Sequence, residues 1–220
     1  NSNQQDTAEE VQQYAAEHGI EFPIAKDYGN EVADRYGVTR TPEVFLLDGE
    51  LTVHYRGRVD DQYLPGQTRA APLREDLLTA LREVRAGGPV SVPRTEPNGC
   101  LIGRVRKPVT DADITFTNQV SRILNTHCVE CHRNGEIGPF ALTDYDEVIG
   151  WADMILETID DGRMPPWHAN PHVGDFANAR HMPEEDKQTL RDWVAAGTPY
   201  GEVAELPEPP SFTHGWQLPR

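Results

Sequence analysis

The stretch Asn125–Phe140, NTHCVECHRNGEIGPF, holds two of the three cysteines in this chain of 220 residues. Cys128 and Cys131 are three positions apart and His132 follows directly, which matches the C-x-x-C-H sequence at which c-type haem is attached. One helical turn places both thiols beside the vinyl groups of a single porphyrin, and the next residue can then direct its imidazole at the iron. The motif therefore predicts one covalent haem c, with Cys128 and Cys131 as thioether residues and His132 as an axial ligand.

Other interpretations of the two cysteines stay open. A structural zinc site would need two more ligands, and the chain has no second C-x-x-C pair, although His168, His172 and His181 could supply nitrogen. A thioredoxin-type dithiol normally lies where a strand meets a helix, whereas here a helical segment leads into the motif and the irregular RNGEIGPF follows it. A plain disulfide would leave the adjacent histidine unexplained.

A second axial ligand is expected from the downstream segment DGRMPPWHANP. Met164 offers a thioether sulfur, and the two prolines after it stiffen the chain where that sulfur must be held against the iron. We expect Pro165 and Trp167 to pack near the ring. Met182 is a weaker candidate for the ligand, as are the three histidines named above, and Met154 is interpreted as core.

Three predicted helices surround the motif. The first begins near Thr117 and runs into the cysteines. The second covers residues 145–159, where apolar residues recur at helical spacing, with Thr143 as its cap. The third opens at Pro183, carries acidic residues in its first turn and stops at Gly197. These patterns predict an all-α domain around the cysteines.

The first part of the chain mixes helical and strand patterns. Thr7 and Glu10 are spaced to form a capping box at the start of the first helix. The dipeptide Asp48-Gly49 between two apolar runs is a strong hairpin signal. The expected elements are helices at 6–18, 30–36 and 72–84, a strand at 21–27, and a hairpin made by Val44–Leu47 and Leu51–Tyr55.

Proline, glycine and polar residues mark the expected boundaries. We predict a first domain over residues 1–88, a linker over 89–112, a helical domain over 113–201 and a proline-rich tail over 202–220. Cys100 lies in the predicted linker. It is interpreted as a partly buried, unreactive cysteine, with a free thiol or an intermolecular bridge as alternatives.

The charge of the chain restricts its partners. With 36 acidic and 20 basic residues the net charge is -16, which repels nucleic acid and favours a redox protein partner that carries a basic patch. No apolar run approaches the length of a membrane span, so no membrane span is expected.

The segments CVECH, GRMPPW and DKQTLRDWVAAG together resemble a class I-type cytochrome c domain, in which three helices surround one haem. The resemblance covers roughly residues 112–201. It implies His132 as the proximal ligand and Met164 as the distal ligand, with Trp193 packing in the core. The expected fold class is α+β: a partial thioredoxin-like α/β segment followed by an all-α mono-haem domain.

The order of elements before residue 88 resembles the second half of a thioredoxin-like (redoxin) domain. Thr41-Pro42 matches the position at which that family has a cis-proline facing the catalytic cysteine, although a trans proline opening an edge strand is the alternative. The first half of that fold, with its cysteine, has no counterpart in this sequence. The resemblance therefore implies further domains or another chain that completes the sheet.

The combination resembles multidomain exported bacterial proteins of the planctomycete type, in which a redoxin segment is fused to a cytochrome c domain. It implies electron transfer in the periplasm or another exported location, where haem is attached to this motif. Two alternatives stay open. The chain could relay electrons in a larger enzyme, a thiol oxidoreductase or a copper monooxygenase, or its haem could act as a sensor.

Overall fold

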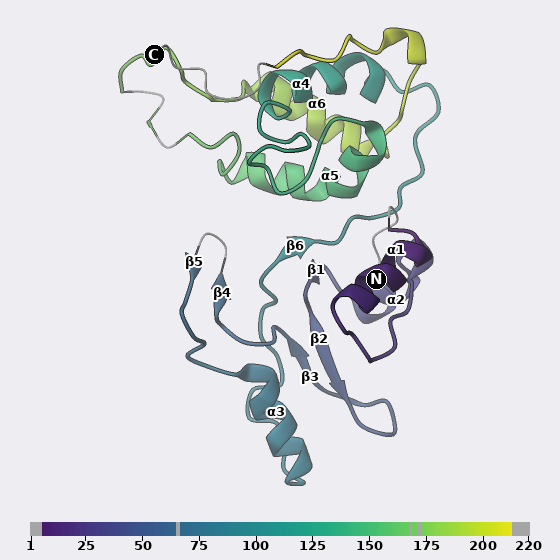
Figure 1. Cartoon of the computed structure of the whole chain (residues 1–220), viewed down its shortest axis with the longest axis vertical. Helices are drawn as coiled ribbons and strands as arrows, with labels where there is room; N and C mark the ends of the chain where they lie inside the picture. Colours follow the sequence, from purple (N-terminus) through teal and green to yellow (C-terminus); the bar gives the residue numbers. More distant parts are fainter. Residues whose placement is uncertain (1–5, 65–66, 168, 171–172, 213–220) are drawn as a thin grey trace. The chain divides into compact units, whose positions relative to one another are not determined.

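The structure is a computed structural model (Figure 1), and it describes residues 6–64, 67–167, 169–170 and 173–212. Its contacts divide the chain into two compact units. One unit comprises residues 30–102, and the other comprises the described residues of 3–29 and of 103–220. No helix in the described ranges is long and apolar enough to cross a membrane.

A β-hairpin is the centre of the unit formed by residues 30–102. Strand β2 (Val44–Leu47) pairs antiparallel with β3 (Val53–Gly57), and helix α3 (Asp76–Arg85) packs against both strands. Tyr55 is fully buried, and its hydroxyl donates a hydrogen bond to the Arg58 carbonyl at 2.6 Å. The predicted hairpin is confirmed, and its burial against α3 supplies the packing that an isolated hairpin lacks.

The turn of the hairpin is longer than the Asp48-Gly49 turn that the sequence predicts. The Asp48 carboxylate accepts hydrogen bonds from two backbone amides of the loop, at 2.9 Å each. Leu51 takes the left-handed conformation, with φ +62°, and β3 begins only at Val53. Because the Asp48 side chain bonds the loop amides, residues 48–52 do not continue the strand ladder.

Helix α2 (Glu31–Tyr36) follows a 3-10 turn, η1 (Tyr28–Asn30), and ends at Gly37, as predicted. Gly37 has φ +63°, a left-handed conformation that glycine adopts at little cost. The Tyr36 ring meets the ring of Phe45 edge-on, with centroids 5.1 Å apart, so α2 is joined to the hairpin through strand β2.

Helix α3 begins later than predicted, at Asp76 rather than Pro72. The backbone amides of Leu73 and Arg74 donate to the Asp61 carboxylate at 2.8 and 2.9 Å, which keeps the chain before the helix irregular. The helix buries Asp76 and Ala80. Three leucines in and just before the helix are exposed, namely Leu73, Leu78 and Leu81.

The predicted linker contains a strand. β6 (Cys100–Leu101) pairs antiparallel with β1 (Arg40–Thr41), and Cys100 stands opposite Thr41. The Thr41-Pro42 peptide bond is cis, as the redoxin resemblance implies. A second short pair joins β4 (Tyr63–Leu64) to β5 (Gln67–Thr68).

Helix α1 (Ala8–Glu17) starts with the predicted capping box. The Thr7 hydroxyl accepts from the Glu10 amide, and the Glu10 carboxylate accepts from the Thr7 amide at 2.7 Å. The strand predicted for residues 21–27 is wrong, because this segment forms no ladder and Pro23 lacks an amide donor.

Residues 103–212 are helical in their described secondary structure. A π-helical turn, η2 (Phe116–Val120), leads into α4 (Ser121–His127), and two longer helices follow, α5 (Tyr145–Asp160) and α6 (Glu184–Ala195). A 3-10 turn, η3 (Val203–Glu205), comes last. The cap of α5 is Asp144, one residue after the predicted Thr143, and it forms a capping box with Glu147.

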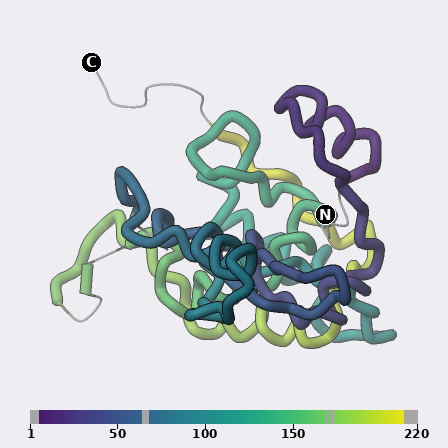
Figure 2. The backbone as a smooth tube through the Cα atoms, turned by 90° about the horizontal axis from the view of Figure 1, so that it is seen from below, coloured from purple at the N-terminus to yellow at the C-terminus, as the bar shows by residue number. Residues whose placement is uncertain are grey.

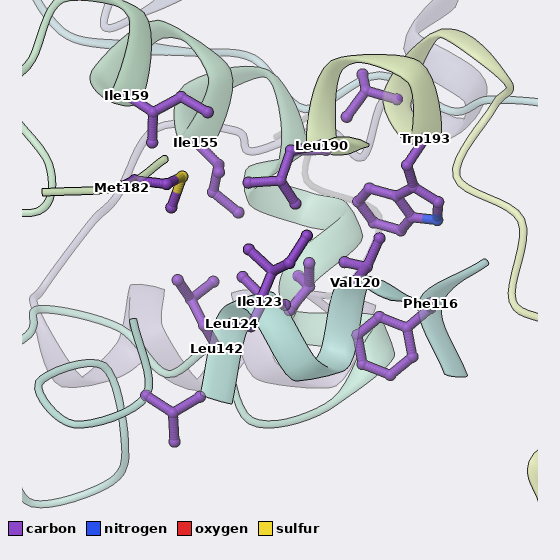
Figure 3. Packing of buried hydrophobic residues seen from close by; sticks show 14 residues of the cluster. Phe116, Val120, Ile123, Leu124, Leu142, Ile155, Ile159, Met182, Leu190 and Trp193 are labelled. Carbon is purple, nitrogen blue, oxygen red and sulfur yellow. The ribbon is translucent and has the colours of Figure 1, made fainter. Parts of the chain in front are cut away.

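These helices share one apolar core (Figure 3). The Trp193 ring lies beside Val120 and Phe116, and its Nε1 donates to the Pro199 carbonyl at 2.9 Å. Figure 2 shows the backbone of the same helices, from the teal-green of α4 to the yellow-green of α6. The buried members of the core include Phe116, Val120, Leu124, Val129, Leu142, Ile155, Ile159, Met182, Leu190 and Trp193.

Candidate functional site

The C-x-x-C-H residues lie on one turn of chain at the end of α4. The Cys128 amide donates to the Leu124 carbonyl at 2.8 Å, which closes the helix. The Cys128 carbonyl then accepts from the amides of Cys131, at 3.1 Å, and His132, at 2.9 Å. Both cysteines are half-buried free thiols. The structure therefore brings together the three residues that the spacing predicts to act together.

The His132 ring is held by a backbone carbonyl. Its Nδ1 lies 3.1 Å from the carbonyl oxygen of Phe140. A carbonyl can only accept, so Nδ1 carries the proton, and in the neutral ring Nε2 is then the nitrogen with a lone pair for a metal. This is the arrangement in which histidine ligands are usually oriented, with the second ring nitrogen bound to a neighbouring acceptor.

Gly138 lets the loop after the motif approach the His132 ring. Its amide donates to the Cys131 carbonyl at 2.8 Å. A Cβ atom at this position would lie 2.6 Å from the Cys131 oxygen and 2.9 Å from Nδ1 of His132. Only glycine fits there without movement of the motif turn.

We expect Gly138→Ala to destabilise the helical unit, residues 103–212, by about 1–3 kcal/mol. The added methyl overpacks the turn and displaces the His132 ring. Denaturant unfolding monitored by circular dichroism measures the change. Gly49→Ala is the matched control, since no atom lies within 4 Å of a Cβ there and its φ is not left-handed. Equal midpoints for the Gly138→Ala variant and the unsubstituted chain would contradict the role assigned to Gly138.

An aromatic stack backs the His132 ring. The Phe140 ring centroid lies 4.8 Å from that of His132, and Phe140 stacks on Trp151 with centroids 3.9 Å apart and planes 11° from parallel. The sequence analysis did not identify Phe140 or Gly138 as parts of the site. Phe140 acts through its backbone carbonyl and Gly138 through the absence of a side chain, so residue-type patterns gave no direct signal for either.

The Cys128 thiol is protonated at neutral pH. Burial, together with the nearby Cys131, raises the pKa of Cys128 to about 12. Disulfide exchange uses the thiolate, and reactive cysteines have lowered pKa values. Cys128 therefore lacks the lowered pKa that is typical of a reactive dithiol cysteine.

Met164 lies on the loop after α5. Its amide donates to the Thr158 carbonyl at 3.0 Å, and the Met164-Pro165 peptide bond is cis. The side chain is 39% exposed and lies outside the apolar core. Trp167 meets Phe176 edge-on, with ring centroids 5.6 Å apart. Iron ligation by Met164, and packing of Pro165 and Trp167 on a haem, stay predictions.

The weaker ligand candidates have different surroundings. Met182 is 5% exposed and lies in the apolar core close to Ile155 and Ile159 (Figure 3). His181 is exposed, whereas His168 and His172 lie outside the described residues.

In the described part of the chain, no group of three or more His, Cys, Asp or Glu side chains is arranged to hold a metal ion. These side chains therefore provide no four-ligand zinc site. A haem c requires a different set of groups from the chain: two thiols, one oriented imidazole and one further axial ligand. The motif turn meets the first two requirements.

A match to a known protein family covers the first part of the chain. Residues 3–56 match the model of the AhpC/TSA family, which is less than half of the chain. No curated protein matches the chain. The family match supports the thioredoxin-like interpretation of this segment and the mixed fold with a partial thioredoxin-like part. Residues 3–56 are thus similar to the AhpC/TSA redoxins.

Proposed function

We propose that this chain is an electron-transfer protein whose helical unit carries a single haem c. Cys128 and Cys131 form the thioethers, and Nε2 of His132 and the sulfur of Met164 ligate the iron. The hydrogen bond from Nδ1 of His132 to the Phe140 carbonyl carries the proposal, because it orients a metal-binding nitrogen on the turn that also bears two free thiols.

Haem c bound here would supply a one-electron iron couple. The residues of the chain hold it and set its surroundings. Thioethers from Cys128 and Cys131 keep the ring in place although the helical unit is small. Val129 lies inside the motif and is buried, as is Leu142, whose amide donates to the His132 carbonyl at 2.9 Å. Ligation by one imidazole and one methionine sulfur would raise the reduction potential relative to ligation by two imidazoles.

Haem staining after denaturing electrophoresis tests the proposal. We expect the exported, matured chain to keep its stain and to show the added mass of one haem by intact mass spectrometry, because thioether bonds survive denaturation. Expression without export to an oxidising compartment is the control, and there we expect no haem, in keeping with a periplasmic or otherwise exported protein. A matured chain without stain would overturn the proposal.

The redox partner is proposed to be a protein with a basic patch. The chain has a net charge of -16, and its helical unit carries Glu184, Glu185 and Asp186 in the first turn of α6. Opposite charge on the partner would steer the encounter and speed association.

A second candidate is the electron-relay part of a larger thiol oxidoreductase, and the AhpC/TSA match favours it. The matched residues 3–56 contain no cysteine, so any thiol chemistry there would use Cys100, which stands opposite Thr41, or further domains or chains that complete the sheet. Peroxide reduction that depends on added dithiol and is lost in Cys100→Ser would favour this candidate.

A further inference from the structure

A bidentate ion pair joins the C-x-x-C-H turn to the segment before α6. Arg180 binds Glu130, with Nη1 2.8 Å from Oε2 and Nη2 3.1 Å from Oε1. Glu130 stands between Cys128 and Cys131. The hydrogen bonds and charge of Glu130 raise the pKa of Arg180, and the sulfur of Cys131 adds to the effect. The guanidinium therefore binds the carboxylate of the residue that lies between the two cysteines.

Arg180 belongs to the loop that carries Met164. Between α5 and α6 the structure describes residues 161–167, 169–170 and 173–183, and this α5–α6 loop is attached at its start by the bond from the Met164 amide to the Thr158 carbonyl. Near its end the Met182 side chain is buried in the core. Arg180 lies two residues before that anchor, so it joins the returning arm of the loop to the turn that carries His132.

We propose that Arg180 is a positioning residue for the iron site: through Glu130 it holds the α5–α6 loop against the C-x-x-C-H turn and so keeps the Met164 sulfur within reach of the iron. This role rests on the proposed function. A planar guanidinium suits it, because its fork can meet both carboxylate oxygens at once, whereas a lysine would act as a single point charge.

The expected effect is modest. Arg180 and Glu130 are 43% and 58% exposed, so solvent screens their attraction. We expect loss of the pair to raise the population with a dissociated Met164 sulfur about threefold, which lies within the range measured for exposed pairs. An external ligand that binds iron only after the sulfur leaves would then bind about threefold more tightly.

The experiment titrates imidazole into the oxidised, haem-loaded full chain and follows loss of the sulfur-to-iron absorption band. It compares Arg180→Gln, Arg180→Lys and Glu130→Gln with the unsubstituted chain. Arg191→Gln is the matched control, because Arg191 also binds two carboxylates, of Asp160 and Glu184, and joins α5 to α6 without a described contact to the motif turn. Amide hydrogen exchange of residues 176–182 is measured on haem-loaded and haem-free chains.

We expect tighter apparent imidazole binding in Arg180→Gln and Glu130→Gln, partial recovery in Arg180→Lys, and faster exchange of residues 176–182 in both glutamine variants with or without haem. Arg191→Gln should leave imidazole binding unchanged. Unchanged exchange in Arg180→Gln would show that the Arg180–Glu130 pair does not hold the α5–α6 loop. Faster exchange with unchanged imidazole affinity would show that the pair does not position the iron ligand. An equal effect in Arg191→Gln would also overturn that positioning role. A matured chain without haem is a separate result, because it contradicts the proposed function itself.

Discussion

The double variant Cys128→Ser/Cys131→Ser should contain no covalent haem, because serine hydroxyls do not form the thioether bonds that anchor the ring. We expect the variant to lack both the haem stain after denaturing electrophoresis and the added mass of haem in the intact chain. Each single variant can still form one thioether bond, and we expect it to carry haem in reduced yield. This is the largest effect expected of any substitution in the chain.

Cys100→Ser is the matched control for the cysteine experiment, since Cys100 is also a half-buried free thiol but lies in strand β6. It should keep full haem content. Covalent haem in the double variant, or loss of haem in Cys100→Ser, would show that the wrong cysteines have been assigned.

Met164→Leu should abolish the sulfur-to-iron absorption band and lower the reduction potential by roughly 0.1 V or more, a fraction of the ~0.8 V over which axial ligands set haem potentials. The reason is that a thioether ligand favours reduced iron, and leucine has no atom that can replace it. Spectroscopy of the oxidised chain and a redox titration provide the two measurements. Haem should stay attached, because the thioethers are untouched.

Met182→Leu is the control for the methionine experiment. Met182 lies among apolar side chains of the core, where a swap of similar volume costs less than about 1.5 kcal/mol. We expect this variant to keep both the band and the potential. Loss of the band in Met182→Leu together with its survival in Met164→Leu would move the distal ligand to Met182.

Local patterns predicted much of the fold. The capping box of Thr7 and Glu10, the stop at Gly37 and the hairpin of β2 and β3 are set by neighbours in sequence, and all three are confirmed. The start predicted for α3 was wrong because Asp61, from an earlier loop, accepts hydrogen bonds from the backbone amides that precede the helix. Pairing of β6 with β1 was also missed, since it joins segments that lie far apart in the chain.

By itself the sequence determined which residues could act together at the motif. The spacing of Cys128, Cys131 and His132 places them on one turn wherever that turn lies, because the geometry is that of the local backbone. The acidic charge and the absence of cysteine before Cys100 are also properties of the sequence alone.

Only the tertiary structure decided how those residues are oriented and what surrounds them. The tautomer of His132 depends on the Phe140 carbonyl, and the close approach of that loop depends on Gly138. The ion pair between Arg180 and Glu130 joins residues 50 positions apart. Such contacts form only when the core brings distant segments together, so residue type and spacing do not reveal them.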